Sequence, residues 1–135
     1  MSDRNRVLDG LLILVVLAHL AVTIFHGRAH TGAVVPVSTM ATFFIFSVII
    51  VAPLVGAVVL WFFSIETGAW LLALSLAASL IFGVVNHFIL ESPDHIARIA
   101  AAWKGLFTAT AVLLALTEAL GSGLAFWRAA QVRMR

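Results

Sequence analysis

The chain has 135 residues, of which 63% are apolar and only 10% are charged. Soluble domains are roughly a quarter charged and about half apolar, so this composition excludes an ordinary soluble domain and a disordered chain and predicts an integral membrane protein. A net charge of +2 without a basic run argues against nucleic acid as a partner. The absence of cysteine excludes disulfides, thiol catalysis and cysteine-ligated metal clusters.

Four stretches reach the length of about 20 apolar residues that a helix needs to cross a bilayer. They run from about Val7 to His26, Ser38 to Ser64, Gly68 to Leu90 and Leu106 to Ala129, with Pro53 inside the second. Short connections make sequential helices antiparallel neighbours. We therefore predict an all-α, single-domain transmembrane four-helix bundle over residues 1–135, with up-down-up-down topology.

The connection after the third stretch carries signals for the start of a helix. Ser92 can cap a helix, Pro93 suits the first helical position and Asp94 favours a helix N-terminus. An apolar face follows at helical spacing, formed by Ile96, Ile99, Ala100 and Trp103. These features predict a short amphipathic helix lying in the membrane interface.

The tryptophans and the basic residues orient the predicted bundle. All four tryptophans lie at predicted helix ends, where indole rings favour the headgroup level: Trp61, Trp70, Trp103 and Trp127. Five basic residues lie on the side of the termini (Arg4, Arg6, Arg128, Arg133 and Arg135), against three on the other side (Arg28, Arg98 and Lys104). This bias predicts a multi-pass protein of the inner or plasma membrane with both termini in the cytoplasm.

Histidines and acids gather at the predicted extracytoplasmic end, where ionisable groups near membrane helices mark function. His30 follows His26, and Glu91 follows His87, each four residues later and so on the same helix face. Imidazole and carboxylate together suit Zn, Fe, Mn or Cu, and helical bundles build such sites from facing helices. The predicted ligands of this transition-metal site are His26, His30, His87, Glu91 and His95.

Four other polar residues are expected to orient these ligands or to form a proton relay: Asp94, Asn86, His19 and Glu118. His19 lies two turns below His26, and Glu118 falls near the midpoint of the last helix at a similar depth, so the two side chains can meet. Asp9 is expected to point to a different face. Because the polar residues stop at this depth, the pattern predicts a closed outer cavity and not a channel.

Three functional interpretations remain open at this stage. The favoured one is a small metal-binding membrane protein, with enzymatic action on a lipophilic molecule such as a quinone, an isoprenoid or a hydrocarbon. The second is a haem b electron carrier, in which His26 and His87 are the axial ligands and Gly83 makes room for the macrocycle. The third is a non-catalytic subunit of a homo-oligomer or larger membrane complex, because Ala73 and Ala77 belong to small-residue faces that suit helix contacts.

Overall fold

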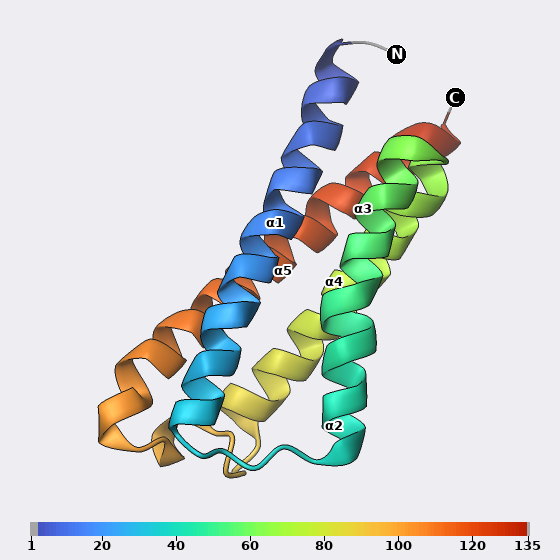
Figure 1. Cartoon of the computed structure of the whole chain (residues 1–135). Coiled ribbons are helices and arrows are strands. Elements are labelled where there is room, and N and C mark those ends of the chain that lie inside the picture. Colours follow the sequence, from blue (N-terminus) through green and yellow to red (C-terminus); the bar gives the residue numbers. More distant parts are fainter. Residues whose placement is uncertain (1–2, 135) are drawn as a thin grey trace.

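The computed structural model describes residues 3–134, with side chains from Arg6 onward, and its regular structure in that range is helical (Figure 1). Four helical runs are long and apolar enough to cross a membrane: Arg6–Gly32, Thr39–Phe62, Ile65–Ile89 and Ala101–Arg133. The four predicted segments are thus confirmed as helices, and the first and last extend beyond their predicted ends. Their mean hydropathy, between 1.6 and 2.8, indicates a membrane protein.

The elements follow the chain in a simple order. Helix α1 spans Asp3–Gly32, and the second run consists of α2 (Thr39–Phe44), the π-helical η1 (Ile45–Val51) and α3 (Ala52–Phe62). Helix α4 (Ile65–Val84) continues into the π-helical η2 (Val85–Ile89), and a 3-10 turn, η3 (Ile96–Arg98), precedes α5 (Ala101–Arg133). The start of α1 and the end of α5 lie at the upper end of Figure 1, and the α1–α2 and α4–α5 connections lie at the lower end.

Pro53 explains the π-helical turn in the second run. Proline has no N–H, so the carbonyl of Ile49, four residues earlier, lacks its α-helical donor. The chain widens into η1 at this point instead of breaking, and α3 begins directly after it. The ring of His19 on α1 takes up the free acceptor, because its Nε2 lies 3.1 Å from the Ile49 carbonyl oxygen. The proline therefore creates a polar link between the first two helical runs.

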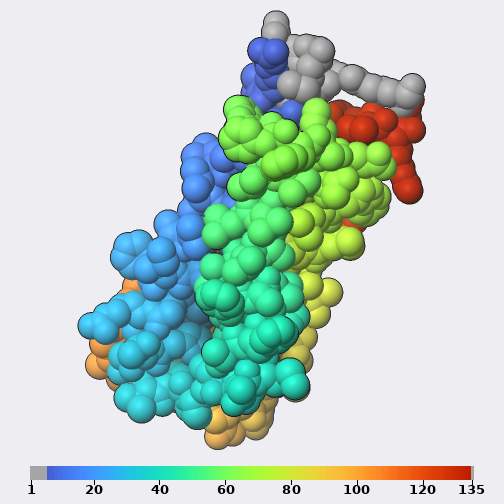
Figure 2. Space-filling model, turned by 45° about the vertical axis from the view of Figure 1, so that its right-hand side comes forward, coloured from blue at the N-terminus to red at the C-terminus, as the bar shows by residue number. Residues whose placement is uncertain are grey.

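The larger apolar core occupies the half of the bundle that contains the ends of the chain, and a smaller one, formed by Ala29, Ile99 and Phe107, lies at the other end. Helix α5 packs against α1 and α4, and α3 packs against α4 and α1. Alanines let the helices approach closely there; the buried core residues are Leu12, Val16, Ala57, Leu60, Ala69, Leu72, Ala73, Ala125 and Ala129. Along the face in Figure 2, α1 and the α2–α3 run lie side by side. Large apolar side chains such as Leu14, Ile24 and Phe25 face outward, as a lipid environment favours.

The tight turn between α3 and α4 depends on Gly68. A Cβ atom at this position would overlap the backbone of Leu60, which cannot rotate away as a side chain can. We expect Gly68→Ala to destabilise the protein by about 1–3 kcal/mol through overpacking. The unfolding temperature in detergent would fall accordingly. Gly123→Ala on α5 is the matched control, because no atom lies within 4 Å of its added Cβ. Equal unfolding temperatures for the two variants would contradict this account of the turn.

The structure differs from the sequence prediction in the connection before α5. The amphipathic helix predicted after Ser92 is not formed, and only the 3-10 turn η3 is helical there. His87 Nδ1 donates to the backbone carbonyl of Asp94 at 3.1 Å, which ties this part of the connection to the π-helical turn η2. The Arg98 N–H donates to the carbonyl of His95 at 2.8 Å. The connection is thus shaped by its contact with His87.

Candidate metal centre

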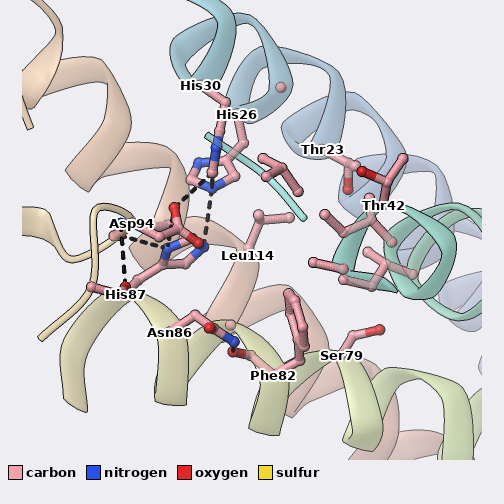
Figure 3. Close-up of a pocket in the computed structure, with 18 of the residues that line it drawn as sticks. Thr23, His26, His30, Thr42, Ser79, Phe82, Asn86, His87, Asp94 and Leu114 are labelled. Atoms are coloured by element: carbon pink, nitrogen blue, oxygen red, sulfur yellow. Dashed lines mark hydrogen bonds and ion pairs between the residues drawn. The ribbon is translucent and has the colours of Figure 1, made fainter. Parts of the chain in front are cut away.

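Three histidines from two helical runs meet at the lower end of the bundle, and we call them the histidine cluster: His26, His30 and His87 (Figure 3). His26 Nε2 lies 3.1 Å from His87 Nε2 and 3.2 Å from His30 Nε2. One ligand atom from each ring falls within 4.8 Å of the others. The ring of Phe107 on α5 packs against all three imidazoles, with centroid distances of 4.8 to 5.3 Å. The cluster therefore has an apolar wall on one side.

The local helix geometry places these rings. Helix α1 continues to Gly32, so His26 and His30 are one helical turn apart on one face. His87 lies in the π-helical turn η2, a type of turn that is frequent at functional sites. Asn86 does not reach the cluster; its side-chain amide donates to the carbonyl of Phe82 at 2.8 Å and satisfies the backbone of this turn.

Thr110 determines which nitrogen of His26 faces the cluster. The Thr110 hydroxyl donates to the carbonyl of Leu106 at 2.7 Å, so its oxygen is free to accept from His26 Nδ1, 2.8 Å away. With the hydrogen of the neutral ring on Nδ1, Nε2 carries a lone pair that points at the other two rings. Thr110 was not singled out by the sequence analysis. The available signal is its position eight residues before Glu118, on the same face of the last helix.

Asp94 determines in the same way which ring nitrogen of His87 faces the cluster. The backbone carbonyl of Asp94 accepts from His87 Nδ1, and the carboxylate Oδ1 lies 3.3 Å from the same nitrogen. The lone pair of neutral His87 is therefore on Nε2, directed at the lone pair of His26 Nε2 only 3.1 Å away. Two lone pairs at this distance repel each other unless a cation lies between or beside them. A proton or a metal ion shared by the two nitrogens relieves this repulsion, so the cluster could hold a positive ion.

The spacing of the nitrogens fits a first-row metal ion. Metal–nitrogen bonds of about 2.0–2.1 Å at tetrahedral angles separate neighbouring ligand nitrogens by about 3.3–3.4 Å. The two Nε2–Nε2 distances of 3.1 and 3.2 Å are close to this value. The histidine cluster could therefore hold a metal ion. Three imidazoles without sulfur suit Zn, Cu or Fe, and three protein ligands leave a fourth position open.

Asp94 contributes negative charge beside the cluster. Its Oδ1 lies 3.2 Å from His30 Nε2 and 3.3 Å from His87 Nδ1. Burial alone raises the pKa of this carboxyl, but the close contact with His87 and the neighbouring imidazoles of His30 and His26 outweigh burial and lower the pKa below its ordinary value. The group is thus a carboxylate at neutral pH, and it can orient the His87 ring as a histidine that binds a metal requires.

Two of the predicted ligands lie outside the cluster. Glu91 is exposed and pairs with Arg98, 3.5 Å from Oε2 to Nη2, and His95 Nδ1 accepts from the backbone N–H of Ala97 at 3.1 Å. The predicted spacing assumed that the α-helix continues through Glu91. Instead the helical run ends at Ile89, and Leu90 is extended, with φ −77° and ψ 129°. The chain therefore turns back and presents Asp94 to the histidines in their place.

The same spacing bears on the haem interpretation. Axial histidines of a haem oppose each other across the iron at roughly 4 Å, twice a metal–nitrogen bond. His26 Nε2 and His87 Nε2 are 3.1 Å apart, and the third nitrogen, that of His30, lies beside His26. Three converging nitrogens at these distances favour a single small ion over a macrocycle.

A cavity of about 490 Å³ adjoins the cluster and is enclosed by the first, second, third and last helical runs. All three histidines contribute to its wall, and in Figure 3 they lie on the other side of it from Thr42. None of the residues of the larger core lines the cavity. An ion held by the three rings would thus have its open position accessible from a mostly apolar cavity of ligand size.

The deeper pair predicted from the sequence is also brought together. His19 Nδ1 lies 3.8 Å from Glu118 Oε1, and both residues are buried. The Glu118 side chain forms part of the cavity wall, nearer the middle of the bundle than the histidine cluster. The contact expected between the two side chains is therefore close, although it is longer than a hydrogen bond.

Comparison with known proteins gives no match. No family model, no curated protein and no solved structure is similar enough to the chain to suggest a function. The functional argument therefore depends on the residues described above.

A buried ion pair in the other half of the bundle was not predicted. Arg128 Nε donates to Asp9 Oδ1 at 2.6 Å, and Arg128 Nη2 donates to Asp9 Oδ2 at 3.1 Å. Asp9 thus faces α5, where the sequence analysis expected a different face, and Arg128 is not a free charge of a loop. Without Arg128, four basic residues remain on the side of the termini, against three on the other side. Two of those four, Arg4 and Arg135, lie outside the described side chains.

Proposed function

We propose that the protein is a membrane metalloprotein that binds one transition-metal ion through His26, His30 and His87 and uses it as an enzyme on a lipophilic substrate. The observation that carries the proposal is the convergence of three ring nitrogens, of which those of His26 and His87 have their lone pairs directed at each other by hydrogen bonds on the far side of each ring. Zinc is the first choice among Zn, Fe, Mn and Cu, because it accepts three imidazoles with an open fourth position.

The cavity supports action on a substrate from the bilayer. A metal with an open position polarises an oxygen-containing group or activates water. The chain's own residues would hold the ion, orient the ring of His87 through Asp94 and keep bulk water out with the wall formed by Phe107. A lipophilic molecule of moderate size would reach this position through the apolar part of the cavity.

The proposed membrane arrangement is an up-down-up-down bundle with both termini in the cytoplasm of the inner or plasma membrane. The remaining excess of basic residues beside the termini supports this orientation. The metal centre would then lie at the extracytoplasmic end. A reporter fused after the last residue is expected to show a cytoplasmic signal, and a periplasmic signal would invert the orientation.

Elemental analysis tests the proposed metal directly. Protein purified without chelator and without an affinity metal is expected to contain about one equivalent of a transition metal, as a single three-histidine site requires. Replacement by Co²⁺ should give the visible absorption of a nitrogen-ligated ion in tetrahedral geometry. A protein that neither contains metal nor takes it up from Zn²⁺ or Co²⁺ solutions would refute the proposal.

Asp94→Asn should weaken this metal binding without removing a ligand. The amide preserves the size of the side chain but loses the negative charge beside His30 and His87, and such supporting residues typically account for 10- to 100-fold in affinity. The Kd for Zn²⁺, measured by competition with a chelator, is expected to rise by about this factor. Glu91→Gln is the matched control, since Glu91 lies on the surface beside Arg98. Equal effects of the two variants would contradict a role for Asp94.

A further inference from the structure

The Glu118 side chain, which lines the cavity, faces the buried ring of His19 across a gap. Glu118 on α5 is 3% exposed and His19 on α1 is 2% exposed. The 3.8 Å between Glu118 Oε1 and His19 Nδ1 exceeds the hydrogen-bond range of about 2.7–3.2 Å. Within the described part of the chain, His19 Nδ1 has no hydrogen-bond partner. Because an unpaired buried polar group is costly, this gap calls for a third group.

Pro53 determines which hydrogen-bonding atoms border the gap, because it fixes the tautomer of His19. His19 Nε2 carries the ring hydrogen, because it donates to the Ile49 carbonyl that Pro53 leaves free. Nδ1 therefore presents a lone pair to the gap, and the Glu118 carboxyl group lies opposite. A neutral carboxyl group is the less costly form in an apolar wall, and it can donate a hydrogen bond. The gap is thus bordered by one acceptor and one donor.

We propose that His19 and Glu118 bind the hydroxyl group of a lipophilic alcohol that occupies the cavity. A hydroxyl oxygen about 2.8 Å from both atoms would close the 3.8 Å gap, with an angle of about 85° at that oxygen. The hydroxyl donates to His19 Nδ1 and accepts from the Glu118 carboxyl, so the nitrogen that lacks a partner is satisfied. This site does not require a metal in the histidine cluster and is separate from the proposed function.

The rest of the cavity fits the apolar body of such a molecule. Its volume of about 490 Å³ lies within the usual range for small ligands, and most of its lining is apolar, with Ile45, Ile50, Phe82 and Leu114 among the lining residues. A charged ligand would lose its hydration without a compensating ion at the gap. An alcohol with a hydrocarbon chain or ring is therefore the class that matches both parts of the cavity.

Gly83 connects this gap to the histidine cluster. A Cβ atom at Gly83 would lie 3.9 Å from Glu118 Oε2 and 4.0 Å from His87 Cδ2. The carboxyl group and the ring of His87 thus border the same open position on α4. An alcohol bound at Glu118 would therefore have atoms next to the ring of His87, and a large side chain at Gly83 would take its place.

Binding of tritiated 1-dodecanol and tritiated dodecane tests the proposal. Both probes are applied to the protein in lipid nanodiscs, with empty nanodiscs subtracted, before and after treatment with a chelator. We expect the alcohol to bind about tenfold more tightly than the alkane, the difference that a buried hydrogen-bonded hydroxyl provides. Glu118→Leu should abolish this preference and leave the binding of dodecane unchanged, and Glu66→Gln, an exposed acid at the other end of α4, should leave both unchanged.

Two further variants keep the test decisive if Glu118→Leu does not fold. His19→Leu should remove the preference for the alcohol in the same way, and Gly83→Leu should weaken binding of both probes by filling the cavity. Equal affinities of the wild-type protein for the alcohol and the alkane would overturn the proposal and assign the gap to water. A preference for the alcohol in a protein that binds no metal would support this site and refute only the proposed metal centre.

Discussion

His26→Ala is expected to abolish metal binding while the protein stays folded in detergent. His26 is the central ligand of the cluster, because its Nε2 is the nitrogen that lies next to both other rings. Without it only His30 and His87 remain, and two imidazoles hold a first-row ion far more weakly than three. We expect the Kd for Zn²⁺ to rise by at least about 100-fold, measured by chelator competition and by elemental analysis of the purified variant.

His95→Ala is the control for this variant. It removes an imidazole from the same end of the molecule, but His95 accepts from the backbone of Ala97 and lies outside the cluster. Metal content should therefore remain at the wild-type level. Loss of metal in both variants would show that His95 joins the site. Retention of metal in both would remove the histidine cluster from the proposed function.

Arg128→Leu is expected to be the most destabilising single substitution in the protein. It leaves the Asp9 carboxylate buried between α1 and α5 without its two hydrogen bonds from the guanidinium group. Breaking a buried ion pair from one side costs about 3–5 kcal/mol, because a charge remains without compensation. The variant should unfold at a clearly lower temperature or denaturant concentration than the wild-type protein in the same detergent.

The double variant Asp9→Leu/Arg128→Leu separates a lost charge from lost packing. Replacing both partners by apolar residues removes the uncompensated charge, and such replacements are often neutral or stabilising. We therefore expect the double variant to recover most of the stability lost in Arg128→Leu. A double variant that is as unstable as the single one would show that the ion pair is needed for the packing of α1 on α5.

Hydropathy and helical spacing were sufficient for the four helices and for the centre of the site. A continuous apolar run of this length has one stable form in a membrane, so the helices follow from composition alone. His26 and His30 share a face because they are one turn apart, and His87 lies at a matching depth on another helix. The contact between His19 and Glu118 follows from the same reasoning about depth.

The parts that sequence could not provide depend on a departure from the regular α-helix or on contacts between different helices. The π-helical turn η2 and its end at Ile89 decide that Asp94, and not Glu91, approaches the histidines. The pairing of Asp9 with Arg128 requires the crossing of α1 and α5, which spacing within one helix does not determine. Thr110 is one of many hydroxyl groups in apolar helices, and only its contact with His26 distinguishes it.

The two halves of the bundle are packed unevenly: the half that contains the ends of the chain holds the larger core, and the half with the histidine cluster holds the cavity. Helix α2 buries no residue and η1 buries only Ile49, whereas the opposite half contains the alanine-rich core and the ion pair. Amide hydrogens of α2 and η1 should consequently exchange earlier than those of α3 and the second half of α5. Substitutions in α2 should likewise cost less unfolding free energy than substitutions in the alanine-rich core, because fewer packed contacts are lost there. Such a division lets the ligand preference of the cavity diverge in evolution while the anchoring half of the bundle stays the same.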